Sequence, residues 1–157
     1  MKRANLPSSE APENVTLPLT IGRREFITFV DWPVRRLRAK IDTGAYTSAL
    51  DVASYEVSEN NGAGRVAKVR LAPSRKHPER VVEFEAPVVR MTVVRNSGGN
   101  PEQRPVIETT VRLGPVTKRI HVALTRRPGM RFRMLLGRRA IAGDFVVDVA
   151  KRYLLRS

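Results

Sequence analysis

Alternation of apolar and charged residues with a period of two is the feature that most restricts how this chain can fold. Residues 35–41 read RRLRAKI, in which every second residue from the leucine onward is apolar, and residues 106–113 and 118–124 repeat the pattern. Such alternation puts the apolar side chains on one face of a half-buried strand. Long helical patterns are absent, and eleven prolines and ten glycines interrupt the chain. The sequence therefore predicts an all-β domain of short strands.

The predicted strands follow one another with turns between them. They comprise residues 21–30, 35–41, 81–95 with a break at Pro87, 106–113, 118–124 and 132–136, and we expect residues 144–149 and 152–155 to close the sheet. Residues 47–55 fit either a short helix or a strand. One short helix is expected within residues 138–143, after Gly137 has ended a strand.

Polar segments separate these strands. Residues 56–80 contain a turn signal at 60–62 and a loop at 74–78, and residues 96–104 have the composition of a hairpin tip. Residues 1–18 are rich in Pro, Ser, Asn and Glu without periodicity, so we expect a flexible lead-in there. Residues 19–157 are expected to form a single domain.

Basic residues far outnumber acidic ones. The chain has 29 Lys and Arg against 15 Asp and Glu, a net charge of +14, and residues 118–143 contain no acidic residue at all. Such a field attracts anions, whether nucleic acid or acidic peptides, and says nothing about the fold.

Other classes of protein are excluded by composition. The chain has no cysteine and two histidines, His77 and His121, which excludes a disulfide framework, a thiolate nucleophile and a Cys-based or His-rich metal site. No apolar run approaches the roughly 20 residues of a membrane span, and the first residues lack the apolar region of a secretory signal. We expect a soluble cytoplasmic protein that contacts no membrane.

The motif with the clearest chemistry is Asp42-Thr43-Gly44, which follows the alternating strand 35–41. An acid protease needs an Asp that projects from a tight turn toward a partner carboxylate. The Thr hydroxyl can lock that turn by hydrogen bonding, and Gly lets the backbone approach closely. Alone, the motif is also an ordinary turn sequence.

A second motif lies some 90 residues downstream, where Met134-Leu135-Leu136 is ended by Gly137 and followed by Arg138. An apolar strand ended by glycine before a short helix is the usual companion of Asp-Thr-Gly in a pepsin-like half-barrel. Each residue alone also fits a plain buried strand. The two motifs in this order, within an all-β chain, are far more specific.

Three blocks, AKIDTGAYTSAL, NSGGNPEQRPVIETTV and MLLGRRAIAGDFVVD, together resemble the retropepsin-like proteins linked to the RimK glutamate ligase, also called RimB-like. The resemblance covers about residues 20–156. It implies a retropepsin-like half-barrel that acts as a homodimeric aspartic peptidase, with one Asp42 from each subunit. Two carboxylates about 3 Å apart share a proton, so that one acts as general base on water and the other as general acid. Thr43 would hold the two loops together across the two-fold axis.

The resemblance also implies where substrate binds. By position, the hairpin near residues 88–107 matches the retropepsin flap, although a plain surface turn is the alternative; glycines at its tip suit a mobile lid. The expected substrate-binding residues are Ala45, Tyr46, Ser97, Gly98, Gly99 and Arg138.

The chain departs from the family pattern at three positions. Tyr46 stands where an Arg is usual, Asp51 where a His is frequent, and Val149 where a Pro follows Val-Asp. In retroviral relatives the arginine after Leu-Gly pairs with an acid in the slot of Tyr46. We therefore expect Arg138 to have another partner or to face substrate.

Family members are often labelled ATP-dependent zinc proteases. This sequence has neither a His-Glu-x-x-His motif nor a phosphate-binding G-x-x-x-x-G-K-[ST] loop, and His77 and His121 are far apart in the chain. We therefore expect no metal and no cofactor.

The main hypothesis is an aspartic peptidase that cleaves acidic, glutamate-rich tails such as those made by a RimK-type ligase, since a basic groove would concentrate them. One alternative is a non-catalytic basic β-barrel that binds RNA or ribosomes, although the nine aromatic residues do not cluster. Nucleic acid is thus a secondary partner. Another alternative is an inactive retropepsin-like adaptor.

Overall fold

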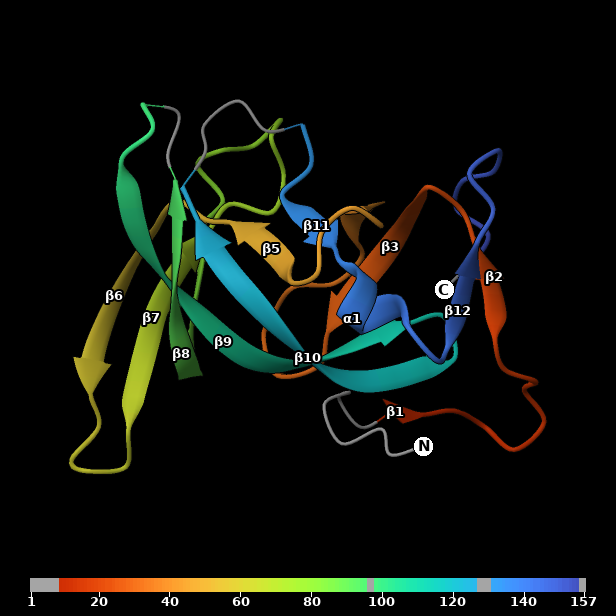
Figure 1. Ribbon diagram of the computed structural model, residues 1–157, viewed down its shortest axis with the longest axis horizontal. Coiled ribbons are helices and arrows are strands. Elements are labelled where there is room, and N and C mark those ends of the chain that lie inside the picture. Colours follow the sequence, from red (N-terminus) through yellow and green to blue (C-terminus); the bar gives the residue numbers. More distant parts are fainter. Residues whose placement is uncertain (1–8, 96–97, 127–130, 156–157) are drawn as a thin grey trace.

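The computed structural model describes residues 9–95, 98–126 and 131–155, which are almost wholly β-strand (Figure 1). The elements are β1 (Ser9–Glu10), β2 (Leu19–Ile21), β3 (Arg24–Phe29), β4 (Leu37–Ile41), β5 (Ser48–Asp51), β6 (Ser54–Glu59), β7 (Arg65–Leu71), β8 (Val82–Arg95), β9 (Pro101–Leu113), β10 (Val116–Thr125), β11 (Met134–Leu136), α1 (Arg138–Ile141) and β12 (Phe145–Val147). The predicted all-β class and the short helix after Gly137 are confirmed.

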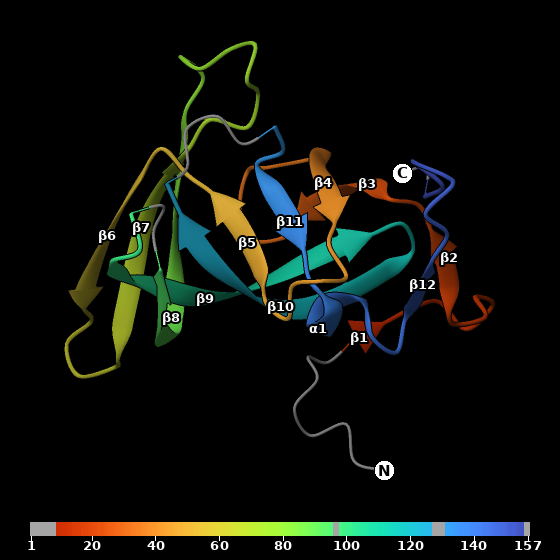
Figure 2. The ribbon, with the colours of Figure 1, turned by 45° about the horizontal axis from the view of Figure 1, so that its top comes forward.

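Six strands close into a barrel in the order β10-β5-β11-β4-β3-β9, and β9 pairs in turn with β10. β5 runs parallel to β10 and β4 parallel to β11, whereas the other neighbours are antiparallel. In Figure 2, β5, β11 and β4 lie side by side, and β4 points toward α1. The closure brings the ends of β4 and β11 together, although about 90 residues separate them in the chain.

The same sheet continues beyond the barrel from β9 through β8 and β7 to β6, and Figure 1 shows this extension projecting to the left of the barrel. Residues 56–80 are polar and carry no predicted strand, yet they contain most of β6 and all of β7, which pair with one another. The turn at residues 60–62 is confirmed: the Asn60 N–H donates to the Gly64 carbonyl at 2.8 Å. The predicted break at Pro87 is also wrong, since β8 runs through it and the register shifts between Val88 and Arg90.

The strand prediction 21–30 splits into β2 and β3. The prediction that residues 144–149 close the main sheet is wrong, because β12 pairs with β2 in a separate two-stranded sheet, and residues 152–155 form no strand. Instead, this last segment is held by Glu25, whose buried carboxylate accepts hydrogen bonds from the backbone N–H groups of Gly22, Leu154 and Leu155 at 2.7–3.0 Å. A buried carboxylate needs such donors to offset the loss of water. The end of the described chain is therefore fixed beside β3.

A buried ion pair joins β10 to the segment that follows α1. Lys118 on β10 donates to the Asp144 carboxylate and to the Ala140 carbonyl, both at 2.6 Å, and the Ser9 hydroxyl donates to the same carboxylate at 3.1 Å. β1 pairs with β10 at Lys118. These contacts fix the segment that follows α1 against the barrel.

The core lies inside the barrel and continues under the part of the sheet formed by β8 and β7. Phe29, Trp32 and Phe84 stack on one another with ring centroids 4.6 and 3.8 Å apart. The alternation in residues 35–41 is confirmed, because Leu37, Ala39 and Ile41 are buried while the two residues between them are exposed. Within the described residues, no helix has the length and apolarity that crossing a membrane requires.

Candidate active site

Asp42 lies directly after β4, in the turn that the sequence predicts. Its N–H donates to the Leu136 carbonyl at 2.9 Å, which ties the Asp to β11. Its carboxylate Oδ1 accepts a hydrogen bond from the Gly44 N–H at 3.0 Å. A Cβ at Gly44 would lie 3.2 Å from the same oxygen. The backbone of the loop therefore orients one oxygen of the Asp42 carboxylate. The absence of a side chain at Gly44 leaves the space beside that oxygen open.

β11 and α1 support this loop from one side. The Gly137 N–H donates to the Ser48 hydroxyl at 3.0 Å. The next two N–H groups donate to the loop itself, from Arg138 to the Ala45 carbonyl at 2.7 Å and from Arg139 to the Tyr46 carbonyl at 3.1 Å. The first N–H groups of a helix have no partner within the helix. Here they fix the backbone that follows Asp-Thr-Gly.

Gly137 is required by space. A Cβ there would lie 2.8 Å from the Thr47 carbonyl carbon and 2.9 Å from the Ala45 carbonyl oxygen. The backbone φ of Gly137 is −86°, which any residue adopts. The glycine of the Leu-Leu-Gly motif therefore permits close packing of the Asp42 loop against β11.

Arg138 has another partner, which is one of the two outcomes that the sequence predicts. Its Nη1 donates to the Thr43 carbonyl at 3.1 Å, and its guanidinium lies 5.8 Å from the centre of the Tyr46 ring. Arg138 and Tyr46 are both exposed. The arginine thus bridges α1 and the Asp-Thr-Gly loop at the surface, next to the aromatic residue that replaces the usual arginine.

Arg90 is a contact that sequence reasoning missed. It lies on β8 at the register shift and its Nη2 donates to the Thr47 hydroxyl at 3.4 Å. No motif marks it, because a lone arginine in a strand is ordinary. The stem of the β8–β9 hairpin therefore contacts the segment that follows Asp-Thr-Gly.

The tip of that hairpin carries the predicted flap residues. Ser97 lies outside the described residues; Gly98 and Gly99 are exposed, and Gly99 has a φ of 80°. The Arg95 Nη1 donates to the Gly99 carbonyl at 2.9 Å across the tip. In Figure 1 the tip lies at the upper left, whereas α1 lies near the centre.

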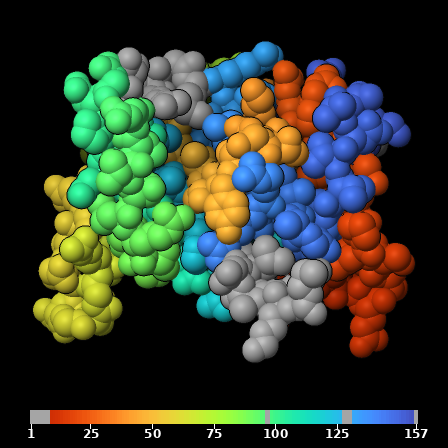
Figure 3. All heavy atoms as spheres, viewed as in Figure 1, coloured from red at the N-terminus to blue at the C-terminus, as the bar shows by residue number. Residues whose placement is uncertain are grey.

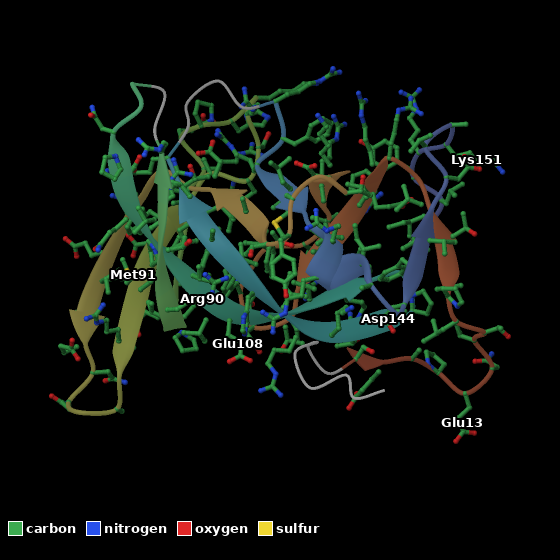
Figure 4. All side chains as sticks on the ribbon, in the orientation of Figure 1. Glu13, Arg90, Met91, Glu108, Asp144 and Lys151 are labelled. Carbon is green, nitrogen blue, oxygen red and sulfur yellow. The ribbon has the colours of Figure 1, made fainter. Side chains whose placement is uncertain are left out.

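A charged cluster surrounds His121 on β10. Its Nδ1 lies 3.5 Å from Arg139 Nη1, and its Nε2 lies 3.9 Å from Glu108 Oε1. Burial lowers the pKa of His121 below 6.5, and the charges of Arg139, Arg90 and Arg119 lower it further against the opposing effect of Glu108. Figure 4 shows Arg90 and Glu108 close together beside β9. The neutral imidazole is thus favoured next to α1.

Asp51 forms a buried ion pair with Arg133. Its carboxylate accepts a hydrogen bond from Arg133 Nη1 at 2.8 Å, and its side chain is 3% exposed. Its N–H also donates to the Arg133 carbonyl at 2.7 Å. This departure from the family pattern therefore holds β5 to the segment before β11.

The loop is accessible from outside. In Figure 3 the orange atoms of the β4–β5 region reach the surface between the green β8 segment and the blue region of α1. Within the described ranges, no group of three or more His, Asp or Glu is placed to hold a metal ion. The chain contains one Asp-Thr-Gly sequence. One copy thus presents one oriented carboxylate of the pair that acid-protease chemistry uses.

Comparison with known protein families gives a match over residues 14–157, to the family described as "RimB-like: Retropepsin-like aspartic endopeptidase RimB". A solved structure, that of the protein of unknown function Lpg0085 from Legionella pneumophila subsp. pneumophila, superposes with a TM-score of 0.74 and 27% identity, covering 88% of this chain and 98% of that one.

Curated relatives carry a different name. A protein of Desulfotalea psychrophila is 32% identical over 83% of this chain, and one of Parasynechococcus marenigrum is 31% identical over 85%. Both are named "Probable alpha-L-glutamate ligase". The chain spans 28% of the length of each of them.

Proposed function

Because this chain belongs to the RimB-like family of retropepsin-like aspartic endopeptidases, we propose that two copies of it form an aspartic peptidase with one Asp42 from each subunit. The observation that carries the proposal is the support of the Asp42 loop by Leu136, Arg138 and Arg139. That support fixes a carboxylate at an accessible turn. A symmetric dimer supplies the second carboxylate that the single motif lacks.

Hydrolysis then proceeds through water. The unprotonated Asp42 takes a proton from water as the water oxygen bonds to the peptide carbonyl carbon, and the protonated Asp42 of the second copy gives its proton to the carbonyl oxygen. The C–N bond of the tetrahedral intermediate breaks as the nitrogen takes up the proton that the first Asp42 received from water, and the Asp42 of the second copy takes a proton back from a hydroxyl group of the intermediate. The two carboxylates share one proton in the resting enzyme because like charges about 3 Å apart do not both ionise.

The neighbouring residues have positioning and binding roles in this proposal. Thr43 links the two loops across the two-fold axis. Ala45 and Tyr46 contact substrate beside the loop, Arg138 positions the loop through its bond to the Thr43 carbonyl, and the hairpin tip at Gly98 and Gly99 closes over the substrate. Arg90, through its bond to Thr47, couples the hairpin stem to the loop.

The proposed substrate is a glutamate-rich tail of the kind that a RimK-type ligase adds to a ribosomal protein in the cytoplasm. Two observations support this class. The net charge of +14 favours polyanions. The relatives named "Probable alpha-L-glutamate ligase" contain a segment like this chain within a much longer polypeptide, so a segment of this kind occurs in proteins named for glutamate ligation.

The test is hydrolysis of an oligoglutamate-tailed peptide by wild type and by Asp42→Asn, with EDTA in a parallel reaction. We expect cleavage that persists in EDTA and is absent from the variant. Cleavage by Asp42→Asn at the wild-type rate would overturn the role of Asp42, and loss of cleavage in EDTA would overturn the metal-free mechanism.

A mixing experiment tests the dimer. With equal amounts of wild type and Asp42→Asn after subunit exchange, activity should fall to about one quarter of that of wild type at the same total concentration, because mixed dimers are inactive. Independent active subunits would instead retain about one half.

A further inference from the structure

Two adjoining hollows lie along the outer side of β4. The larger, of 410 Å³, is lined by the 35–38 segment, the 73–76 loop and residues 131–133. The smaller, of 340 Å³, is lined by residues of β3, the end of β4 and β11. Arg131 and Phe132 line both, so the hollows form one continuous surface, which we call the β4 groove. Ile41 lines its inner end and directly precedes Asp42.

The β4 groove is strongly cationic. Cationic residues of the larger hollow include Arg35, Arg36, Arg38, Arg75, Lys76 and Arg131, and those of the smaller hollow are Arg23, Arg24, Lys40 and Arg131. Among the described residues that line the two hollows, none is an Asp or a Glu. Arg133 also lines the larger hollow, but its guanidinium is paired with Asp51. Clustered like charges in a hollow attract a complementary polyanion.

Aromatic rings hold several of these guanidinium groups in place. Arg24 and Arg131 lie over the Phe132 ring, with Cζ 5.1 and 5.8 Å from its centre. Arg36 lies 4.5 Å from the centre of Phe26, which also stacks on Tyr153. Stacking of this kind orders an arginine and leaves its N–H groups directed to other partners. The groove is thus partly preorganised for anion binding.

The same contacts indicate which class of anion the β4 groove binds. Single-stranded nucleic acid binds largely by stacking bases on exposed aromatic rings. Phe132 is 8% exposed and covered by two arginines, and Phe26 is covered by Arg36 and Tyr153. Guanidinium groups bind carboxylates in bidentate geometry. The groove presents guanidinium groups whose neighbouring aromatic rings are already covered. The β4 groove therefore favours an acidic peptide over RNA.

We propose that the β4 groove binds the acidic tail of the substrate and delivers the adjoining peptide bond to Asp42. The inference rests on the proposed peptidase function and adds the location, direction and extent of the binding surface. β4 (Leu37–Ile41) is extended, and at about 3.3 Å per residue it spans about 16 Å, the length of about five residues of an extended tail. Tail binding should therefore strengthen with tail length up to about five glutamates.

The experiment measures equilibrium binding of fluorescent oligoglutamate peptides to the full chain carrying Asp42→Asn, by anisotropy, so that no cleavage occurs. The groove variant adds Arg38→Glu and Arg75→Glu. The matched control adds Arg65→Glu and Lys68→Glu on the exposed β6–β7 hairpin, with the same change in net charge. Equal unfolding temperatures check that both variants are folded.

We expect the groove variant to lose at least about tenfold in affinity and the control less than about threefold, since nearby charges outweigh distant screened ones. Equal losses in both variants, or none in the groove variant, would overturn the inference. Single-stranded RNA of matched charge that binds more tightly than the peptide and loses affinity in the groove variant would overturn it in favour of nucleic acid. Groove-dependent peptide binding without hydrolysis by wild type would overturn the peptidase proposal alone.

Discussion

Arg138 donates a hydrogen bond from Nη1 to the carbonyl of Thr43 at 3.1 Å, so the residue after the Leu-Leu-Gly strand fixes the middle of the Asp-Thr-Gly loop. The two residues are 95 positions apart. With the N–H bonds of Arg138 and Arg139 to the same loop, α1 is a support for Asp42. Variants at and around α1 should therefore separate positioning of Asp42 from substrate binding and from overall stability.

Replacing Arg138 by Met keeps much of the side-chain volume and removes the bond to Thr43. We expect kcat on an acidic peptide to fall about fivefold to tenfold, because a charged donor to a partly exposed carbonyl contributes about 1 kcal/mol. KM should stay near the wild-type value. A raised KM at constant kcat would assign Arg138 to substrate binding instead, and Arg138→Lys should recover part of the loss.

Gly137→Ala tests the close packing of β11 on the loop. The new Cβ meets backbone atoms of Ala45 and Thr47 at under 3 Å, which cannot move without displacing the loop. We expect a loss of about 2 kcal/mol in the free energy of unfolding and loss of hydrolysis. Gly62→Ala is the control: it lies in open space with a φ of 82°, so it should cost about 1 kcal/mol and leave hydrolysis unchanged.

Asp51 should affect stability without affecting preference for acidic substrates. Its carboxylate is buried against Arg133, and removing one partner leaves the other charge without compensation. We expect Asp51→Ala to lower the free energy of unfolding by about 2 kcal/mol, measured by urea denaturation. The ratio of kcat/KM for an acidic and a neutral peptide should not change. A changed ratio with normal stability would contradict this assignment.

Local sequence patterns predicted the elements that carry the site. The alternation in residues 35–41 gave β4, the apolar run before Gly137 gave β11, and the two motifs together indicated that these strands are neighbours. The signal for β7 was also present, since buried Ala67, Val69 and Leu71 alternate with exposed charged residues. Because its surroundings are polar, no strand was predicted there.

Contacts between distant polar side chains could not be predicted. The Ser48 hydroxyl accepts from Gly137, 89 residues away, and Arg90 reaches Thr47 across 43 residues. Glu25 holds residues 154 and 155 by hydrogen bonds that replace the predicted last strand. An isolated Ser, Glu or Arg in a strand has no periodic pattern that indicates its partner. Each pairing depends on which strands the fold brings together.

The pH dependence of stability should contain a contribution from His121. Its pKa is lowered in the folded state by burial and by the charges of Arg139, Arg90 and Arg119, whereas in the unfolded chain it is about 6.5. As the pH falls below about 6.5, the unfolded state therefore binds a proton before the folded state does. The free energy of unfolding should therefore decrease as the pH falls from about 6.5. The decrease is complete below the pKa of His121 in the folded state.

His121→Gln removes this titration, so we expect a flatter stability curve from about pH 6.5 downward, measured by urea denaturation at a series of pH values. Glu108 partly opposes the lowering of the His121 pKa. Glu108→Gln should therefore extend the decrease to lower pH in the presence of His121, and should have no such effect in the His121→Gln background. A wild-type slope in His121→Gln would show that other groups cause the decrease, and an effect of Glu108→Gln without His121 would show that the two residues are not coupled.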